Sequence, residues 1–212
     1  MKRCRLCRDN NLEQLDTEKG NYYFCCSCHL ISVAKEDILL PAEQKKRYLE
    51  HNNTHENEGY VKMFERFIAK VIQPHVFGVE NVLEFGCGPG PVLADLLKER
   101  GFKVDIYDPF FYPREVFRKR KYGLITATEV FEHLERPDRV LKMLVDHLIP
   151  GGFLAVMTSF HPGPEKFPEW WYKWDPTHII FFDSVTFDWI ADNYFLEKVK
   201  EAEDKYCLFK KK

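Results

Sequence analysis

The sequence lacks a long hydrophobic run, since no apolar stretch approaches the ~18–20 residues that a membrane-spanning helix needs. No apolar stretch follows the basic start of the chain, so we expect no secretory signal. An excess of positive charge is also missing, with 31 Lys and Arg against 33 Asp and Glu and a formal net charge of -2. These absences predict no membrane partner and disfavour extended nucleic-acid binding, which usually requires a basic domain.

Cysteine is scarce outside one short segment. Four of the seven cysteines form two pairs, Cys4-x-x-Cys7 and Cys25-x-x-Cys28, with seventeen residues between the pairs. This spacing is typical of a zinc ribbon, in which four thiolates complete a tetrahedron without an open position. We therefore predict a structural Zn²⁺ bound by Cys4, Cys7, Cys25 and Cys28, in a module of residues 1–40 that has too little core to be stable without the metal.

Alternatives for this module stay open. Cys26 or His29 could replace a neighbouring ligand, and the cysteines could instead form a buried, reduced cluster. The module is also locally basic, which leaves RNA binding as a second use, although acidic residues follow closely. The basic residues are Lys2, Arg3, Arg5 and Arg8, and the acidic ones are Asp9, Glu13, Asp16 and Glu18.

Residues 82–90, VLEFGCGPG, join a short apolar run to glycines spaced two apart, and residues 91–100 then read as a helix. A strand, a glycine turn and a helix are typical of a nucleotide-cofactor site. The glycines let the backbone approach a ligand, and the helix N-terminus presents free N–H groups. A second strand, predicted at 102–107, ends at Asp108, whose carboxylate can accept hydrogen bonds from ribose hydroxyls.

The details of the glycine turn disfavour a dinucleotide. The dinucleotide fingerprint needs a third glycine where this sequence has Pro91. Glu84, inside the strand, would face a pyrophosphate unfavourably, but it suits a ligand that carries an ammonium and a sulfonium group.

These segments resemble the first two motifs of class I S-adenosylmethionine-dependent methyltransferases. Residues 122–134 and 148–156 resemble the fourth strand and the turn into the fifth strand of that family, in the right order. The resemblance covers roughly residues 60–200. It implies an α/β fold with a doubly wound, Rossmann-like, mainly parallel sheet and a reversed C-terminal hairpin, and it implies S-adenosylmethionine as the cofactor.

The same resemblance assigns cofactor contacts. The glycine turn and its preceding acid would hold the methionine part, Asp108 the ribose, and the residues after Asp108 the adenine, while two residues after the fourth strand would line the opposite side. These residues are Glu84, Gly86, Cys87, Gly88, Gly90, Asp108, Pro109, Phe110, Thr128 and Glu129. For Phe110 and Phe111, ordinary core packing is an equal alternative.

One departure from the family pattern concerns its third strand. Only residues 109–121 separate the second and fourth strands here, which leaves room for a short strand at 115–118 but not for a full helix beside it. We therefore predict a reduced third-strand edge of the sheet.

The rest of the chain divides around this core. Residues 41–58 are expected to form a charged helix and a polar join, and residues 59–212 the methyltransferase domain. His51 and Asn53 in the join could reach the cofactor, or the join could be a solvated linker. Near the end of the chain, Ser184 is predicted to cap a helix that reaches residue 193, followed by strands at 195–200 and 205–209.

The most unusual loop is predicted at 159–182, with four prolines and three tryptophans. Its length favours a functional role and its aromatic content disfavours disorder. We predict that this loop forms a wall or lid for the acceptor, where Trp170, Trp171, Tyr172 and Trp174 could stack on an aromatic ring, a base or a sugar. The alternative is that these side chains cover exposed core.

Methyl transfer to an alcohol, phenol or amine requires a base that removes a proton, and histidine is the usual choice near neutral pH. His178 is the first candidate, with Asp175 to orient it, and His133 is the second. His161 is a third candidate, while a purely structural role for His133 remains an alternative.

We therefore expect a methyltransferase for a small molecule with an aromatic or sugar-like face, modified on oxygen or nitrogen. An RNA methyltransferase that grips its substrate with the zinc module is the second hypothesis, and a non-catalytic cofactor-binding module is the third. Unpaired cysteines and an intracellular type of cofactor predict a reducing, cytoplasmic location. The sequence predicts no oligomeric state.

Overall fold

The computed structural model describes residues 3–18, 20–50 and 53–212. Its main feature is a six-stranded sheet with the strand order β5-β4-β6-β7-β10-β9. The first four strands in this order are parallel, and β10 runs antiparallel to both β7 and β9. The strands are β4 (Asn81–Phe85), β5 (Lys103–Tyr107), β6 (Tyr122–Thr128), β7 (Leu148–Met157), β9 (Leu196–Ala202) and β10 (Tyr206–Lys211). The predicted mainly parallel sheet with a reversed C-terminal hairpin is confirmed.

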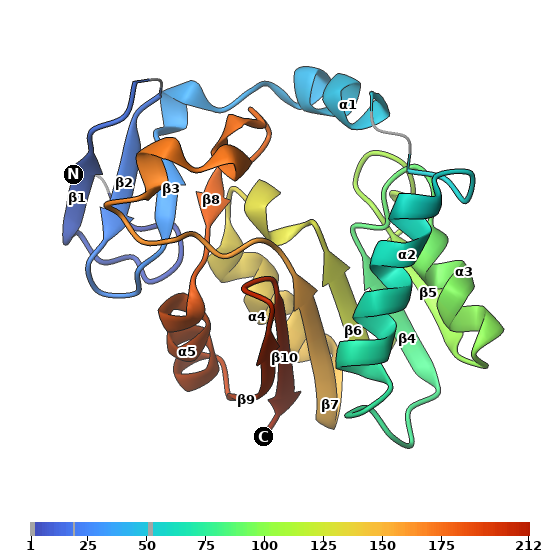
Figure 1. The fold of residues 1–212 in the computed structure, drawn as a ribbon. Coiled ribbons are helices and arrows are strands. Elements are labelled where there is room, and N and C mark those ends of the chain that lie inside the picture. Colours follow the sequence, from blue (N-terminus) through green and yellow to red (C-terminus); the bar gives the residue numbers. More distant parts are fainter. Residues whose placement is uncertain (1–2, 19, 51–52) are drawn as a thin grey trace.

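Helices cover both faces of this sheet because its central strands carry buried side chains on both faces, and every residue of β6 is buried. On one face, Val82 and its neighbours pack against α2 (Glu58–Phe67), its continuation through the π-turn Ile68–Ile72, and α3 (Val92–Glu99). On the other face, Leu83 and its neighbours pack against α4 (Pro137–His147) and α5 (Ser184–Asn193). Figure 1 shows the sheet between these two helical layers.

The edge of the sheet at β5 is shorter than in a full doubly wound fold. The strand expected at 115–118 is wrong, since the chain forms a 3₁₀ turn at Val116–Lys119. Phe117 is buried there, with its ring centroid 4.9 Å from that of Tyr107. Packing this aromatic ring beneath the edge removes residues 116–119 from the sheet, so β5 is its outermost strand among the described residues.

A second sheet, with the order β1-β2-β3-β8, contains the N-terminal module and one strand from the far end of the chain (Figure 1). Its strands are β1 (Leu12–Leu15), β2 (Tyr22–Cys25), β3 (Ile31–Val33) and β8 (Ile180–Phe181). The pairs Ile31↔Phe181 and Ser32↔Ile180 join the module to the long loop that follows β7. The module therefore shares its sheet and its core with the main domain.

Helix α1 (Pro41–Leu49) lies between the two sheets in the sequence and buries none of its residues. Helix α5 begins after Asp183, which is the N-cap in place of the predicted Ser184, because its carboxylate accepts a hydrogen bond from Thr186 N at 2.7 Å. No described helix is both long and apolar enough to span a membrane.

Candidate functional site

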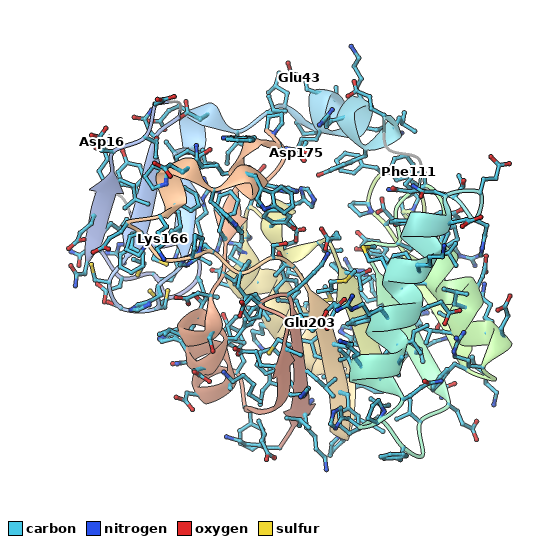
Figure 2. All side chains as sticks on the ribbon, in the orientation of Figure 1. Asp16, Glu43, Phe111, Lys166, Asp175 and Glu203 are labelled. Atoms are coloured by element: carbon cyan, nitrogen blue, oxygen red, sulfur yellow. The ribbon has the colours of Figure 1, made fainter. Side chains whose placement is uncertain are left out.

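A cavity of about 870 Å³ lies at the carboxyl ends of β4, β5 and β6, the usual ligand position in this type of sheet. Helix α1 and the loop after β7 complete its walls. In Figure 2, Asp175 on that loop and Phe111 after β5 lie on opposite sides of the opening. We call the part lined by residues 84–89 and 108–110 the glycine end, and the part around His133, Tyr172 and His178 the histidine end. Gly90, a predicted cofactor contact, is not among the lining residues.

The glycine end depends on positions that only glycine can occupy. Gly86 has a φ of +80°, and a Cβ there would lie 2.3 Å from Val130 Cγ2. A Cβ on Gly90 would lie 1.9 Å from the backbone oxygen of Asn53, so the join is pressed against the turn. Of the two residues of the join expected to reach the cavity, Asn53 lines it. His51 lies outside the described residues.

Glu84 lies at the base of the glycine end and is only 2% exposed. Its Oε2 atom has no hydrogen-bond partner among the described residues. Burial raises the pKa of Glu84 to about 8, because the charged form loses its hydration. A cationic ligand group would stabilise the carboxylate, so this orphaned oxygen fits the predicted ammonium or sulfonium of the cofactor.

Asp108 links the end of β5 to the glycine turn. Its Oδ1 accepts hydrogen bonds from the backbone N–H groups of Phe110 (2.8 Å) and Phe111 (3.1 Å), and its Oδ2 accepts one from Gly88 N (3.0 Å). These bonds fix the carboxylate at the cavity wall beside Pro109. Sequence reasoning assigned Asp108 to the ribose but missed this second task of holding the turn.

Thr128, the last residue of β6, and Glu129, which follows it, both line the cavity, as predicted. Glu129 adopts a φ of +52°, which turns the chain out of the strand. Its Oε2 accepts a hydrogen bond from the Tyr172 hydroxyl at 3.0 Å, and its Oε1 pairs with Lys205 at 3.2 Å. Burial, followed by the nearby charge of Glu132, raises the pKa of Glu129.

The Tyr172 hydroxyl also contacts a second carboxylate, that of Glu132, through its Oε1 atom. Glu132 is fully buried, and its Oε2 lacks a hydrogen-bond partner in the described part of the chain. Sequence reasoning considered Tyr172 only for stacking and did not single out Glu132. The available signal was the pair of acids three residues apart, Glu129 and Glu132, just after a buried strand.

His133 and His178 meet at the histidine end, with ring centroids 4.9 Å apart. Nδ1 of His133 bonds to the Thr177 carbonyl at 2.8 Å, and Nδ1 of His178 bonds to the Tyr172 carbonyl at 2.7 Å. Because a carbonyl only accepts, each Nδ1 carries a proton, so in the neutral imidazole the lone pair is on Nε2. Burial, and then His133, lower the pKa of His178 to about 4, so His178 is neutral at neutral pH.

Asp175 does not supply the predicted hydrogen bond that orients His178, since the Tyr172 carbonyl occupies Nδ1. The Asp175 carboxylate instead accepts hydrogen bonds from Thr177 N (2.9 Å) and Thr177 Oγ1 (2.6 Å), and it pairs with Arg47 of α1 at 3.4 Å. Asp175 therefore shapes the loop and connects it to α1.

His161, the third candidate base, lies outside the cavity lining. Its Nε2 bonds to the His29 carbonyl at 3.0 Å, and it is buried where the loop meets the N-terminal module. This position excludes it as a base in the cavity.

The aromatic side chains of the long loop divide between the two predicted roles. Trp170 packs into the core, with its ring centroid 5.7 Å from that of Phe181. Trp171 and Trp174 line the cavity and are 63% and 69% exposed. Each expectation, core cover and cavity wall, therefore holds for a different part of the same loop.

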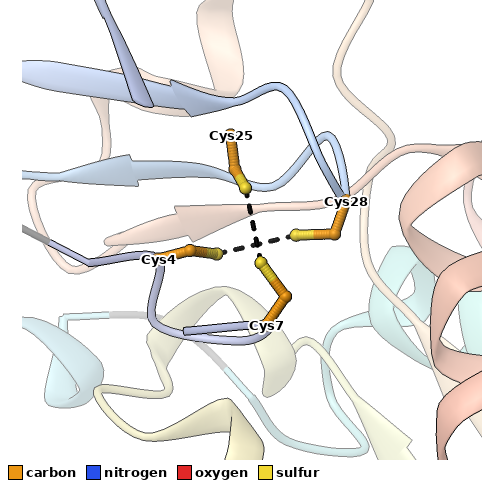
Figure 3. Close-up of side chains that lie close together, drawn as sticks. All are labelled: Cys4, Cys7, Cys25 and Cys28. Carbon is orange, nitrogen blue, oxygen red and sulfur yellow. Dashed lines mark hydrogen bonds between the residues drawn. The ribbon is translucent and has the colours of Figure 1, made fainter. Parts of the chain in front are cut away.

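The four predicted zinc ligands lie together in the N-terminal module. Figure 3 shows the sulfur atoms of Cys4, Cys7, Cys25 and Cys28 directed toward one centre, and all four lie within 4.8 Å of one another. The Sγ atoms of Cys4 and Cys28 are 3.6 Å apart, and those of Cys7 and Cys25 are 3.4 Å apart. Tetrahedral zinc with Zn–S bonds of ~2.3 Å requires sulfur atoms roughly 3.8 Å apart, so the donor set fits this metal. Cys26 and His29 are not members of the cluster.

Comparison with known proteins adds independent information. The sequence profile of a family described as a methyltransferase domain matches residues 36–201. Magnesium protoporphyrin IX methyltransferase from Synechocystis PCC 6803, solved with bound SAH, is structurally similar with a TM-score of 0.53 and 12% identity, over 73% of this chain and 84% of that protein. An O-methyltransferase family protein from Burkholderia thailandensis gives a TM-score of 0.51 and 12% identity, over 79% of this chain and 61% of that one.

A further match is the solved O-methyltransferase segment StiE O-MT, with a TM-score of 0.45 and 16% identity over 66% of this chain. The chain spans about half (52%) of the length of that segment. At these identities, the two matches with higher TM-scores show a shared fold.

Proposed function

The chain belongs to the methyltransferase-domain family and is an S-adenosylmethionine-dependent methyltransferase, and we propose that its acceptor is a small molecule methylated on oxygen or nitrogen. The observation that carries this proposal is the cavity of about 870 Å³, which is continuous from the glycine end to the histidine end. This volume falls in the usual range for small-molecule sites.

The residues of the glycine end fit the cofactor. Its chemistry, when it is bound, is a methyl group already activated on a positively charged sulfur. The orphaned carboxylate of Glu84 would offset the charge of the methionine part, which would lie along the cavity wall formed by residues 86–89. Asp108 would accept hydrogen bonds from the ribose, while Pro109, Phe110 and Thr128 would enclose the adenine and the transferred group.

The histidine end would receive the acceptor. The free Nε2 atoms of His133 and His178 can each accept a proton from a hydroxyl or amine held beside the methyl group, so these two residues stay the candidate bases. Trp171 and Trp174 offer exposed ring faces for an aromatic or sugar-like acceptor. The main contribution of the protein to such a displacement is alignment of the acceptor atom with the methyl carbon.

One structural neighbour supports this acceptor class. The Synechocystis enzyme is named for magnesium protoporphyrin IX, a small molecule. The near-neutral charge of this chain agrees with the same class and gives little support to an extended RNA surface.

We further propose that Cys4, Cys7, Cys25 and Cys28 bind a structural Zn²⁺. All four are unpaired by disulfides and converge on one point (Figure 3). Four sulfur ligands leave no open position, which gives the metal a structural role. Such a site requires cysteines that are not oxidised to disulfides, so we propose that the protein works in a reducing, cytoplasmic compartment.

Transfer of a radiolabelled methyl group into fractionated cell extract tests the acceptor class. We expect label in the low-molecular-weight fraction, insensitive to RNase and to protease. Label that RNase releases would favour the RNA hypothesis, and cofactor binding without any transfer would favour a non-catalytic module. Protein carrying Gly86→Ala serves as the control for background transfer.

A further inference from the structure

Three side chains at the histidine end have the composition of a metal site. Glu132, His133 and His178 each place one potential ligand atom within 4.8 Å of the other two. They come from the 3₁₀ turn after β6 (Phe131–His133) and from the loop before β8, so the fold brings together residues that are far apart in the sequence. This group is separate from the four cysteines of the N-terminal module.

The histidine rings are held as metal-binding histidines usually are. Each donates its Nδ1–H to a backbone carbonyl, at 2.8 Å for His133 and 2.7 Å for His178. Such a bond fixes the tautomer and the ring orientation, and it makes the remaining nitrogen a better ligand. The Nε2 lone pairs are therefore available.

Glu132 provides the third ligand atom. Its Oε1 contacts the Tyr172 hydroxyl, whereas its Oε2 is buried and unpartnered within the described ranges. The neighbouring acid, Glu129, is paired with Lys205, but no described basic residue forms an ion pair with Glu132. A fully buried carboxylate without a counter-charge is unfavourable, and a cation at this point would relieve it.

We propose that Glu132 Oε2 and the Nε2 atoms of His133 and His178 bind a divalent cation of the kind that accepts mixed nitrogen and oxygen ligands, such as Mn²⁺, Co²⁺ or Zn²⁺. Two histidines and one carboxylate leave further coordination positions open. Those positions face the cavity that His133 and His178 line.

The metal would select and activate the acceptor, an extension that rests on the proposed function. While the cation occupies both Nε2 lone pairs, neither histidine can act as the base, so the metal takes the place of the base named under the proposed function. A hydroxyl oxygen bound to the cation loses its proton more readily, and the proton leaves to solvent. That oxygen then forms the new bond to the methyl carbon, while the carbon–sulfur bond breaks and its electron pair neutralises the sulfonium. The products are a methyl ether, S-adenosylhomocysteine and a proton, so the acceptor class becomes a metal-binding alcohol or phenol in preference to an amine.

Mn²⁺ binding to the full chain, followed by electron paramagnetic resonance after the cysteine site has been filled with Zn²⁺, tests the proposal without any acceptor. Mn²⁺ prefers oxygen and nitrogen to thiolate ligands, so it reports on this site. We expect one bound Mn²⁺ per chain, with hyperfine couplings from two directly bound imidazole nitrogens. The absence of saturable binding, or of nitrogen couplings, overturns the proposal even if no variant can be made.

Variants then locate the metal. His178→Asn and His133→Asn keep an amide that can donate to the backbone carbonyl but lack the ligating nitrogen, and Glu132→Gln removes the charge. We expect at least tenfold weaker Mn²⁺ binding in each, since even the loss of a partner behind a ligand typically costs 10–100-fold. His75→Ala, outside the cavity lining, should bind Mn²⁺ like the original protein. Unchanged affinity in all three ligand variants would also reject the site.

The same experiments separate this proposal from the proposed function. Cofactor binding, measured calorimetrically, confirms that each variant is folded, because the glycine end does not include these residues. If Mn²⁺ binds as expected while no small molecule accepts methyl, the metal site stands and the acceptor class is wrong. If small-molecule transfer occurs without metal binding, the acceptor class stands and the metal site is wrong.

Discussion

The glycine end and the histidine end of the cavity are assembled in different ways. At the glycine end, the lining groups come from one segment, residues 84–89, and from Asp108 just after the adjacent strand, and many of them are backbone atoms. At the histidine end, Glu132 and His133 follow β6, while Tyr172 and His178 come from a loop about forty residues further on. The first end is therefore encoded locally and the second by tertiary contacts.

The two ends of the cavity are also stabilised by different parts of the molecule. The histidine end depends on the N-terminal module, because β8 pairs with β3 and the Ile179 N–H donates to the Glu132 carbonyl at 2.8 Å. The glycine end is held mainly by the pairing of β4 with β5 and β6. Perturbing the module should therefore affect the acceptor more than the cofactor.

Loss of zinc is expected to have the largest effect. Structural zinc contributes on the order of 10 kcal/mol to the folding of small modules, so Cys25→Ser should abolish zinc retention and methyl transfer. Cofactor binding should be reduced much less. Elemental analysis, transfer assays and calorimetry measure these three quantities. Cys26→Ser, at the neighbouring cysteine outside the cluster, should retain zinc and activity; a zinc-replete, active Cys25→Ser protein would contradict the assignment.

A substitution in the glycine turn should, in contrast, act mainly by weakening cofactor binding. Gly86→Ala places a Cβ 2.3 Å from Val130 and strains a backbone with a φ of +80°, so we expect at least tenfold weaker binding of S-adenosylmethionine, about 1.4 kcal/mol or more. Gly101→Ala is the matched control, because Gly101 also has a positive φ, +89°, but a Cβ there meets nothing within 4 Å. Equal cofactor affinity in the two variants would argue against a cofactor site at the turn.

The buried Glu84 should make stability depend on pH. Its pKa is raised from 4.5 to about 8 in the folded protein, so the folded state holds its proton more tightly than the unfolded chain does. Stability should therefore fall as the pH rises from 4.5 to 8. Glu84→Gln should remove this pH-dependent loss of stability. The difference in Tm, variant minus original protein, should therefore increase between pH 5 and pH 8 by on the order of 5 °C.

Thermal unfolding of Glu84→Gln at the two pH values measures this difference. The control is Glu80→Gln, because Glu80 is exposed beside the same strand and its pKa is lowered by Lys103. A pH-independent Tm difference between Glu84→Gln and the original protein would show that Glu84 does not titrate in this range.

The smallest effect is expected at the mouth of the histidine end. Trp174→Ala should leave the Tm and cofactor binding unchanged, because the side chain is 69% exposed. Loss of one stacking face should raise the KM for the acceptor about fivefold, or roughly 1 kcal/mol. Initial rates over a dilution series of the active extract fraction give the comparison. Phe77→Ala, at an equally exposed aromatic outside the cavity lining, should change neither quantity; an unchanged KM in Trp174→Ala would remove the tryptophan from the acceptor wall.

Most of the main sheet could be predicted from the sequence because its signals are local. The apolar run before Gly86 became β4, the acid at the end of the next run became Asp108 beside the turn, and the C-terminal hairpin took its expected place. The 3₁₀ turn at Val116–Lys119 was not predictable, since packing of the Phe117 ring under the sheet edge outweighed the strand preference of these residues.

The contact between the N-terminal module and the long loop was also not predictable. The change of composition near residue 40 predicts a module boundary, but it does not indicate that strand β8 pairs with β3 and completes the sheet of the module. Likewise, Asp175 precedes His178 closely in sequence, yet the Tyr172 carbonyl takes the hydrogen bond to Nδ1. Sequence proximity indicates neighbouring residues, whereas the turn geometry decides which of them meet.

The sequence by itself determined the glycine turn after β4, the spacing of the two cysteine pairs and the short apolar runs that form the buried strands, because each depends on a pattern within a short segment. Only the tertiary structure decided that Glu132, His133 and His178 converge and that Tyr172 lies against both Glu129 and the buried Glu132. Such a cluster is set by the packing of the long loop between the sheet and the N-terminal module. Its physical cause lies in long-range burial and pairing, which no local pattern of residues records.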